Sequence, residues 1–400
     1  MADLFYPEMK RIPLLQSLVT VLMLLSLLTA CSLPQVSAEE RMFLDVSLDV
    51  VGEYPLSSKT AMAEQPISHL SGITYQLPGY GSSDAPGIYF YGVSKDEDRA
   101  DGVKLYQLKL DLNRLTSDVT EPSPLTVETV TVLKDQLGQP FQDATFQFES
   151  LAFTPRKSVF ISAEQIQDNQ SVPLIGEFDL QTGQLKNTVP LPPNYRPQEE
   201  EQQPQGIQPH FGFHAMTIAP DGFSLAGLEP FRLFTTTATP LFQDLDAEAT
   251  QLRLLHYVIA DRASFLISEN LYSLEPQSDT DSPYQLAGMV ALPESGHFIS
   301  LERSLTPSGY QSKLYQIFTG NATDTSRITS LRQPISIVEP LRKKLLLDLS
   351  ELKLPPQRFD AMTLGPQLPD GYPSLILMSN DTEDTASVPQ FLLFRIKQAA

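Results

Sequence analysis

Asp360-Ala361-Met362-Thr363-Leu364 is the clearest copy of a five-residue segment that recurs along this chain. In each copy a variable first residue, the head, precedes a small residue, a large apolar residue, a position that is usually small, and a residue that is mostly apolar or aromatic. The other copies are Ser71-Gly72-Ile73-Thr74-Tyr75, Glu149-Ser150-Leu151-Ala152-Phe153, His214-Ala215-Met216-Thr217-Ile218 and Ala287-Gly288-Met289-Val290-Ala291. Steps of 65 to 78 residues between copies indicate one repeated supersecondary unit. They are too long for a helical solenoid and suit a β-propeller with long loops.

Each unit carries the sequence pattern of four strands, which is the makeup of a propeller blade. The recurrent segment is the first strand. We predict second strands at 88–93, 158–163, 223–228, 297–301 and 374–379, and alternating third strands at 103–110, 174–180, 252–259, 313–318 and 391–396. Fourth strands are predicted at 127–133, 185–191, 265–274 and 345–349. The fold class is therefore all-β, a propeller of four-stranded antiparallel blades with five visible units; a sixth blade in the divergent loops stays open.

The last unit ends at Ile396 without a fourth strand of its own. The apolar segment from Phe43 to Val51 is a spare strand, and we expect it to pair with the final blade, since this would remove exposed sheet edges. The propeller domain is thus predicted to span 43–400. The polar segments Pro192 to Pro209 and Glu275 to Pro283 are predicted to be surface loops that bury little apolar area.

The N-terminal 31 residues are predicted to be a lipoprotein signal peptide. Lys10 and Arg11 precede an apolar run that ends in Leu28-Thr29-Ala30-Cys31, which looks like a bacterial lipobox with Cys31 as the lipidated residue. Cys31 is the only cysteine, so no disulfide is expected in the mature domain. Residues 32–42 would be a linker, and translation starts at either Met1 or Met9. An uncleaved membrane anchor is the alternative.

These features predict a protein held in a bacterial cell envelope by its N-terminal lipid, facing the periplasm or the exterior. Ser32 follows the cysteine in place of an aspartate retention signal, and which membrane holds the lipid stays open. The formal charge of −20 argues against a nucleic-acid partner, because phosphate backbones require clustered Lys and Arg. We expect a monomer.

Acidic residues recur at two places in the units: at the heads of the first strands and just after the second strands. If the units form a ring, these carboxylates converge on one axis and repel one another, and a hard cation such as Ca²⁺ would offset that repulsion. The predicted ligands are Glu149, Glu164, Glu229, Glu302, Asp360 and Asp381. The alternative is structural, because acidic residues after a strand often only cap a turn or solvate a loop.

His214 is the only histidine at a recurrent position, and the other four have no metal-ligand spacing with one another. A lone histidine is more often a hydrogen-bonded structural residue than a catalyst. The sequence contains no Gly-x-Ser-x-Gly elbow, no dinucleotide or Walker fingerprint and no His/Cys zinc cluster. These absences disfavour a serine hydrolase, a nucleotide-binding enzyme and a zinc enzyme.

From about Ser68 to the C-terminus, the chain resembles the phytase-like family, also called "esterase-like activity of phytase". The segments that carry the resemblance are Leu70 to Tyr75, Phe148 to Phe153, His214 to Gly222, Leu301 to Ser304 and Lys343 to Asp381. Many cyanobacterial lipoproteins and periplasmic proteins look like this. The resemblance implies a β-propeller that hydrolyses phosphate esters or other esters. The family usually shows Asn-x-Glu-Gly at the heads, whereas here His214 replaces a glutamate and Arg358 stands where an asparagine is expected.

Together, the recurrent acids and the resemblance predict a calcium-assisted phosphoesterase of a small phosphorylated or ester substrate. Glu149 would be a cation ligand or general base, Arg303 would stabilise negative charge on the substrate, and His214 would give a proton to the leaving group. The alternative is a non-catalytic, lipid-anchored propeller that binds a protein partner or a small ligand, since fold alone does not settle function.

Overall fold

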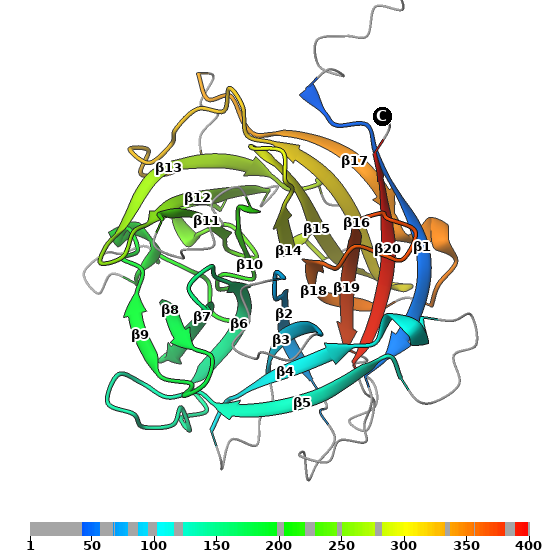
Figure 1. Ribbon diagram of the computed structural model, residues 1–400. Helices are drawn as coiled ribbons and strands as arrows, with labels where there is room; N and C mark the ends of the chain where they lie inside the picture. Colours follow the sequence, from blue (N-terminus) through cyan, green and yellow to red (C-terminus); the bar gives the residue numbers. More distant parts are fainter. Residues whose placement is uncertain are drawn as a thin grey trace, which may run out of the picture. The chain divides into compact units, whose positions relative to one another are not determined.

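Five four-stranded antiparallel sheets make up the unit Asp45–Ala400 in the computed structural model (Figure 1). The structure describes residues 42–56, 67, 69–78, 87–94, 102–115, 123–197, 204–220, 229–245, 250–276, 282–332, 337–355, 357–380 and 389–398. A separate unit, Met1–Leu44, lies almost entirely outside these residues, and so do Cys31, the predicted signal peptide and nearly all of the linker.

Each sheet is a hairpin meander that runs from the inside of the unit to its periphery. The first sheet contains β2 (Leu70–Tyr75), β3 (Ile88–Ser94), β4 (Lys104–Leu110) and β5 (Leu125–Val132). The second contains β6 (Phe146–Phe153), β7 (Ser158–Gln167), β8 (Gln170–Asp179) and β9 (Leu185–Thr188). The third contains β10 (Ala215–Ile218), β11 (Phe231–Thr236), β12 (Gln251–Ile259) and β13 (Ser264–Ser273). The fourth contains β14 (Gln285–Ala291), β15 (His297–Thr306), β16 (Gly309–Phe318) and β17 (Arg342–Asp348). The fifth is ordered β18 (Arg358–Leu364), β19 (Ser374–Asn380), β20 (Gln390–Gln398) and β1 (Val46–Pro55).

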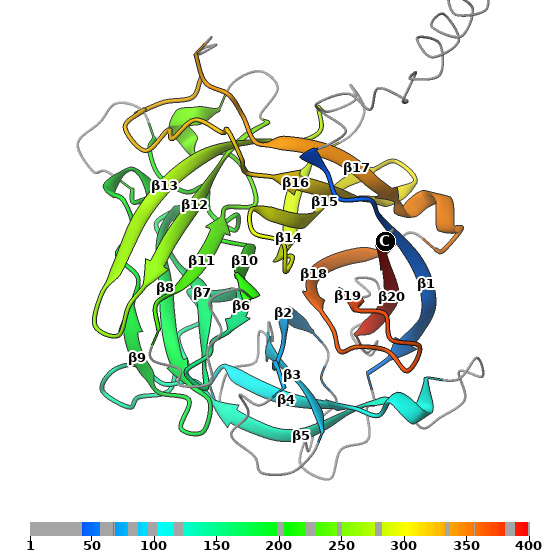
Figure 2. The same cartoon turned by 45° about the horizontal axis from the view of Figure 1, so that its top comes forward.

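The innermost strands form a ring. β2, β6, β10, β14 and β18 each contact the next, and β18 contacts β2. Both ribbon views show these five strands around a common centre, with β1, β5, β9, β13 and β17 at the periphery (Figure 2). The predicted propeller of four-stranded blades is confirmed, with five blades.

The N-terminal strand is the outermost strand of the fifth sheet. β1 runs antiparallel to β20, in a register from Val46 opposite Gln398 to Pro55 opposite Gln390. The sheet edge that β20 would otherwise expose is therefore covered by a strand from the other end of the domain.

One strand prediction is wrong. The second strand of the third sheet is β11, whereas we expected residues 223–228, all of which lie outside the described residues. β11 pairs with β10 from Ile218 opposite Leu233 to Ala215 opposite Thr236. The turn-like Pro220-Asp221-Gly222 suggested a tight hairpin, but the connection runs on to Pro230. Glu229 therefore precedes the second strand instead of following it, and its side chain is exposed.

The small second residue of the recurrent segment is explained by close approach of neighbouring blades. A Cβ added to Gly72 would lie 2.7 Å from Leu151 Cδ2 and 2.8 Å from the carbonyl oxygen of Glu149. A Cβ on Gly288 would lie 2.8 Å from Met362 Cγ. Inner strands crowd near the axis, and a larger residue at this position would push two blades apart.

The recurrent threonine links the blades. Thr74 Oγ1 accepts a hydrogen bond from the Phe153 N–H (3.0 Å), Thr217 Oγ1 from the Ala291 N–H (3.0 Å), and Thr363 Oγ1 from the Tyr75 N–H (3.0 Å). Each bond joins one inner strand to the next, because the inner strands form no backbone ladder with one another. The Thr of the repeat therefore supplies polar contacts that the sheets themselves cannot make.

Apolar clusters fill the gaps between successive sheets. Representative buried pairs are Phe90 with Met378 between the first and fifth sheets, and Phe148 with Val93 between the second and first. Tyr257 packs with Phe160, and Phe298 with Leu252, in the clusters that join the third sheet to its two neighbours. The inner strands of the fourth and fifth sheets contact each other, and a cavity lies between other parts of these two sheets. No helix among the described residues has the length and apolarity needed to cross a membrane.

Candidate functional site

A pocket of about 370 Å³ opens where the inner strands begin, and we call it the axial pocket. Its walls come from the second to fifth sheets and the segments that precede their first strands. The lining residues are Gln147, His210, Phe211, His214, Ser282, Gln285, Arg303, Ser304, Leu305, Tyr310 and Arg358. Two arginines and two histidines are among them, and none of the described lining residues is a carboxylate. The pocket is therefore suited to an anion.

The heads reach this region through β-bulges. The pairing of β6 with β7 shifts between Phe148 and Leu151, and that of β18 with β19 shifts between Phe359 and Ala361. Glu149 and Asp360 are thus the extra residues of two bulges. A bulge re-aims a side chain that would otherwise follow the alternation of its strand, and such bulges are common beside active sites.

His214 lies against Glu149, with 3.6 Å between His214 Nε2 and Glu149 Oε2. Both residues are buried, although His214 also lines the axial pocket. The Phe213 carbonyl, one residue before His214, accepts hydrogen bonds from Ser150 Oγ (2.9 Å) and Ser162 Oγ (2.6 Å). The second sheet therefore fixes the position of the histidine, and Glu149 would stabilise its imidazolium form.

Glu164 is a second buried carboxylate in the same region. Its side chain packs against Gly212, since a Cβ on Gly212 would lie 3.3 Å from Glu164 Cδ. Ser171 Oγ donates to Oε2, whereas Oε1 has no hydrogen-bond partner among the described residues. Burial is the main cause that raises the pKa of Glu164 to about 7; the negative charge of Glu149 adds to it, and the hydrogen bond from Ser171 opposes it. At neutral pH the Glu164 carboxyl is therefore about half protonated.

Arg303 and Arg358 converge on Asp360. Arg303 Nη1 donates to Asp360 Oδ1 and to the Phe359 carbonyl oxygen (2.9 Å), and Arg358 Nε donates to Asp360 Oδ1 at 2.9 Å. Asn380 Nδ2 donates to Asp360 Oδ2 at 2.8 Å. One carboxylate holds two guanidinium groups, so a net positive charge remains for a ligand in the pocket.

The pairing registers show why the predicted acids do not all meet. Glu164 pairs with Gln147, two residues before the head Glu149. The residues two places before the heads Ala287 and Asp360 are Gln285 and Arg358. Gln285 pairs with Arg303, and Arg358 pairs with Asn380. Arg303 thus occupies the place of Glu164 in its own blade.

Glu302 lies one residue away from that place, opposite Leu286, and faces the other side of β15. Lys343 Nζ (2.7 Å), the Glu275 N–H (2.8 Å) and Tyr272 OH all donate to its carboxylate. The hypothesis that Glu302 shares a cation with Glu149 is not supported, because a one-residue shift moves a side chain to the opposite face.

The described residues do not form a calcium site by themselves. No group of three or more His, Cys, Asp or Glu side chains in this part of the chain is arranged to hold a metal ion. Glu149 and Glu164 supply two carboxylates, Glu229 is exposed elsewhere, and Asp381 lies outside the described residues. Ca²⁺ takes six to eight oxygen ligands, more than this pair can offer.

His210, Tyr310 and Arg358 are among the residues of the axial pocket that sequence reasoning missed. Arg358 stood out only as a replacement for an expected asparagine, and its position two residues before a head is the signal that could have identified it. Tyr310 follows Gly309 at the β15–β16 turn, where nothing repeats. The guanidinium of Arg358 lies 6.0 Å from the centre of the Tyr310 ring.

A model of the family described as "Phytase-like: Esterase-like activity of phytase" matches residues 65–382. None of the curated proteins matches the chain. Among solved structures, the chain is similar to the catalytic domain of a GH62 α-L-arabinofuranosidase from Coprinopsis cinerea, with 8% identity, 89% of this chain and 98% of that chain covered, and a TM-score of 0.42.

Two other solved structures are similar to the chain at the same level. The α-L-arabinofuranosidase PaAbf62A from Podospora anserina has 10% identity, covers 89% of this chain and 98% of its own, and has a TM-score of 0.43. A levansucrase mutant from B. subtilis has 9% identity, covers 88% and 84%, and has a TM-score of 0.37. No conclusion about activity follows from similarities at this level.

Proposed function

This chain belongs to the phytase-like family, and we propose that it is a hydrolase of phosphate esters whose substrate binds in the axial pocket. The family description suggests a hydrolase. The observation that carries the finer proposal is the convergence of His214, Arg303 and Arg358 on one pocket whose described lining contains no carboxylate. Phosphate is an anion that arginine recognises through paired hydrogen bonds.

The proposed reaction needs few groups from the protein. Water attacks phosphorus, the bond from phosphorus to the alcohol oxygen breaks, and a proton is delivered to that oxygen, so that an alcohol and phosphate are released. In phosphoryl transfer, catalysis is mostly positioning and charge stabilisation. Arg303 and Arg358 would hold the phosphoryl oxygens, and His214 would be the proton donor to the alcohol.

Glu149 has a supporting role in this proposal. Its carboxylate lies 3.6 Å from His214 Nε2, so it would hold the imidazole in place and favour the protonated form that a donor requires. The proximity of Glu164 opposes a second negative charge beside it. Glu164 would therefore be about half protonated near pH 7, and Glu149 would keep the negative charge that favours the imidazolium.

Calcium assistance remains a prediction that the described residues do not by themselves support. The functional test is turnover of p-nitrophenyl phosphate and of phytate by the purified full chain, with Ca²⁺ and with EDTA. The proposal expects turnover of at least one phosphate ester, and EDTA decides whether a cation is needed. p-Nitrophenyl acetate is the comparison substrate, since preference for it would point to a carboxylic esterase.

If the protein is a non-catalytic binding protein, it should bind a ligand without hydrolysing any ester. Saturable binding of inorganic phosphate, weakened by Arg358→Gln and accompanied by no turnover of any ester, would contradict the enzyme proposal and favour the binding protein. Binding is measured by calorimetry, so that it does not depend on activity.

We also propose that Cys31 carries a lipid that holds the protein in a bacterial envelope. The sequence Leu28-Thr29-Ala30-Cys31 supports this proposal. Expression of the full chain in bacteria, followed by fractionation and mass measurement, tests it. Cys31→Ala is expected to release the protein from the membrane fraction, and unchanged membrane association of this variant would contradict lipidation.

A further inference from the structure

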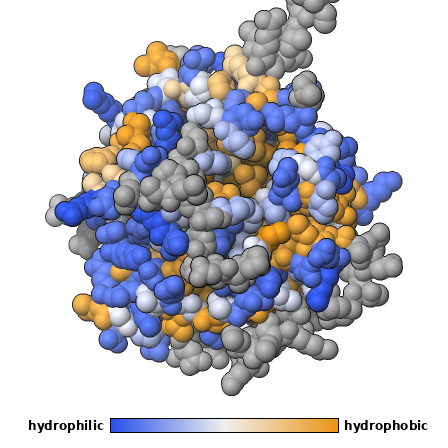
Figure 3. Space-filling view, viewed as in Figure 1, coloured by the Kyte–Doolittle hydropathy of each residue, from blue (hydrophilic) through white to orange (hydrophobic). Residues whose placement is uncertain are grey.

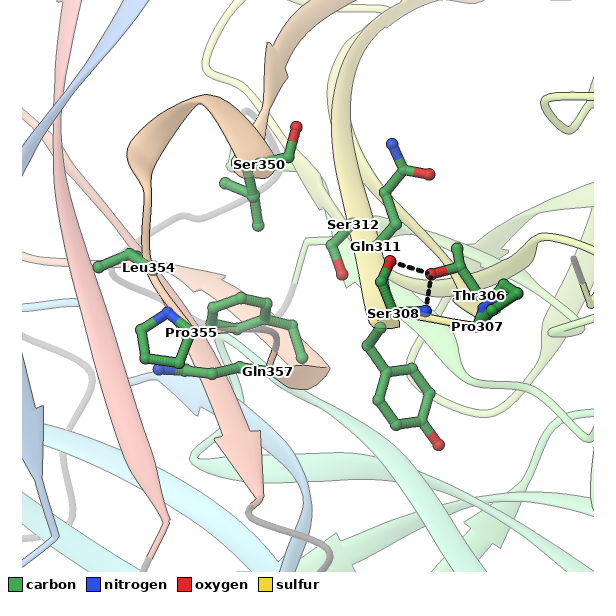
Figure 4. Close-up of a pocket in the computed structure, with 12 residues that line it drawn as sticks. Thr306, Pro307, Ser308, Gln311, Ser312, Ser350, Leu354, Pro355 and Gln357 are labelled. Atoms are coloured by element: carbon green, nitrogen blue, oxygen red, sulfur yellow. Dashed lines mark hydrogen bonds between the residues drawn. The ribbon is translucent and has the colours of Figure 1, made fainter.

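A larger cavity lies between the fourth and fifth sheets, with a volume of about 610 Å³ (Figure 4). We call it the interblade cavity. The β15–β16 turn forms one side, and the segment from η6 (Leu349–Leu352) to the start of β18 forms the other. Apolar clusters pack the other blade junctions, whereas at this one a cavity lies beside the contact of β14 with β18. Its volume is in the range of small-molecule sites.

The described lining of the interblade cavity carries no charge. Hydroxyl groups come from Thr306, Ser308, Ser312 and Ser350, and apolar surface from Leu354 and Pro355. Figure 4 shows the side chains of the β15–β16 turn facing those of the opposite segment across the space. An uncharged cavity of hydroxyl and apolar surface fits an uncharged ligand that bears hydroxyl groups.

One hydroxyl in the cavity wall has no hydrogen-bond partner among the residues that the structure describes. Ser312 is only 3% exposed, and its Oγ makes no hydrogen bond with any described residue. The neighbouring amides are already engaged: Gln311 accepts from Tyr284 OH (3.1 Å), and Gln357 accepts from Ser379 Oγ (2.9 Å). Buried polar groups without partners are rare and ask for an explanation, and a ligand hydroxyl would supply the missing hydrogen bond.

The interblade cavity adjoins the axial pocket. Tyr310 lines both spaces, and the Arg358 guanidinium lies over the Tyr310 ring, 6.0 Å from its centre. Ser312 is the cross-strand partner of Arg303 in the β15–β16 ladder, so these residues share one face of the sheet. A single molecule can therefore contact the arginines of one space and Ser312 of the other.

We infer that the interblade cavity holds the alcohol part of the substrate, and that this alcohol is an uncharged, hydroxyl-bearing group such as a sugar or polyol. The inference rests on the proposed phosphoester hydrolysis, which places the phosphoryl group beside Arg303 and Arg358. Polyanions such as phytate are disfavoured, because further phosphates would enter a space without positive charge and lose their hydration.

Binding of the alcohol part can be tested without turnover. The chain contains no tryptophan, so Ser308→Trp places a single fluorescent reporter on the exposed rim of the interblade cavity. Glucose is expected to change its emission in a saturable way. Adding Ser312→Ala should weaken glucose binding about 3–10-fold, the loss of one hydrogen bond, without lowering the melting temperature. Arg358→Gln should leave glucose binding unchanged. If the reporter variant does not fold, the melting temperature of the unmodified protein with glucose replaces it.

Turnover provides the second test. Glucose 6-phosphate should be hydrolysed with a kcat/KM at least about tenfold above that of phytate. Ser312→Ala should lower kcat/KM about 3–10-fold for glucose 6-phosphate and leave it unchanged for phenyl phosphate, whose alcohol part bears no further hydroxyl.

The outcomes separate this inference from the proposed function. Turnover of phenyl phosphate with no response to glucose, or with no effect of Ser312→Ala on glucose 6-phosphate, overturns the inference and leaves phosphoester hydrolysis standing. Glucose binding that depends on Ser312, without turnover of any phosphate ester, supports the ligand class of the cavity and overturns the proposed hydrolysis.

Discussion

Two clusters of buried charge occupy this propeller, one beside the axial pocket and one inside the third blade. In the second cluster Arg253 is 1% exposed and donates to both oxygens of Asp244, with 2.9 Å between Nη2 and Oδ1. Its Nη1 donates to Glu269 and to the Ile328 carbonyl oxygen (2.9 Å). The two carboxylates accept further bonds from Tyr195 OH and the Leu331 N–H.

The two clusters differ in completeness and in access. The Arg253 guanidinium is surrounded by protein partners and lines none of the pockets described above. In the axial cluster, Arg358 is partly exposed, Glu164 Oε1 has no described partner, and a pocket opens over His214. Burial of charge alone therefore does not mark a functional site. Burial combined with an unfinished set of contacts and an open face does.

On the face seen in Figure 1, polar residues predominate and apolar residues occur among them in small groups (Figure 3). Such a surface is ordinary for a globular protein and does not single out either cluster. Substitutions within each cluster are therefore needed to show which one stabilises the fold and which one binds substrate.

The largest effect is expected from breaking the closed cluster. Arg253→Leu leaves two buried carboxylates without their cation, so we expect the free energy of unfolding to fall by about 3–5 kcal/mol. Urea denaturation measures this loss. Arg262→Leu is the matched control, since its side chain is 95% exposed and its removal should change stability by less than about 0.5 kcal/mol. Equal effects of the two variants would contradict a structural role for the closed cluster.

The open cluster should respond in activity instead. We expect His214→Asn to lower kcat for phosphate ester hydrolysis about 10²–10⁴-fold, the usual contribution of a positioned proton donor. His297→Asn is the control and should retain activity, because His297 is the first residue of β15 and Arg303 of the axial pocket lies toward the other end of that strand. Steady-state kinetics and thermal melting are measured together, because loss of activity that merely follows loss of fold would count against a role in proton transfer.

The Glu164 carboxyl predicts a pH dependence of stability. Its pKa in the folded protein is about 7, above the ordinary value of 4.5, so the folded state binds more protons between these two values. The free energy of unfolding should therefore fall as pH rises from about 4.5 to 7, by up to about 3 kcal/mol, and level off above. Glu164→Gln should remove this component.

Ser171→Ala provides the matched test for Glu164. The Ser171 hydroxyl donates to the carboxylate and favours its charged form. Without it, the fall in stability should extend to higher pH. Identical pH profiles for the unmodified protein, Glu164→Gln and Ser171→Ala would show that Glu164 does not titrate in this range.

The smallest effect is expected at the edge of the open cluster. Arg358→Gln removes one of two arginines while Arg303 and Asn380 still hold Asp360. We expect KM for a phosphate ester to rise about tenfold, roughly 1.4 kcal/mol, with little change in stability. Arg342→Gln, whose ion pair with Glu339 is exposed, should leave KM unchanged. If Arg358→Gln lowers the free energy of unfolding more than the free energy of substrate binding, Arg358 stabilises the fold and does not bind substrate.

The repeated segments made the fold predictable, because crowding near the axis restricts residue choice in every blade. Gly72 and Gly288 are small since no Cβ fits there, and the recurrent threonines form bonds between blades. The loop from Pro192 was not predictable in this way. It was expected to bury little apolar area, yet Tyr195 is fully buried in the junction between the second and third sheets.

The site was predictable only in part. Proximity of His214 to Glu149, and of Arg303 to Asp360, follows from a ring of equivalent positions. The predicted ring of acids is not observed. Its members were aligned by their distance along the sequence from the second strands, whereas the bulges at the heads decide which residue of the second strand lies beside each head. Through that one-residue difference, Glu302 turned to the far face and Arg303 took the place of an acid.

The antiparallel pairing of β1 with β20 has a consequence for biosynthesis. Val46 and Gln398 are opposite each other, so the first strand of the domain has no sheet to join until the last one has left the ribosome. Blades can form in sequence as they emerge, but the fifth gains its outer strand only after β20 has emerged. A chain truncated before Gln390 would lack both the partner and the place for its N-terminal strand, and quality-control proteases would meet an exposed extended segment at its start.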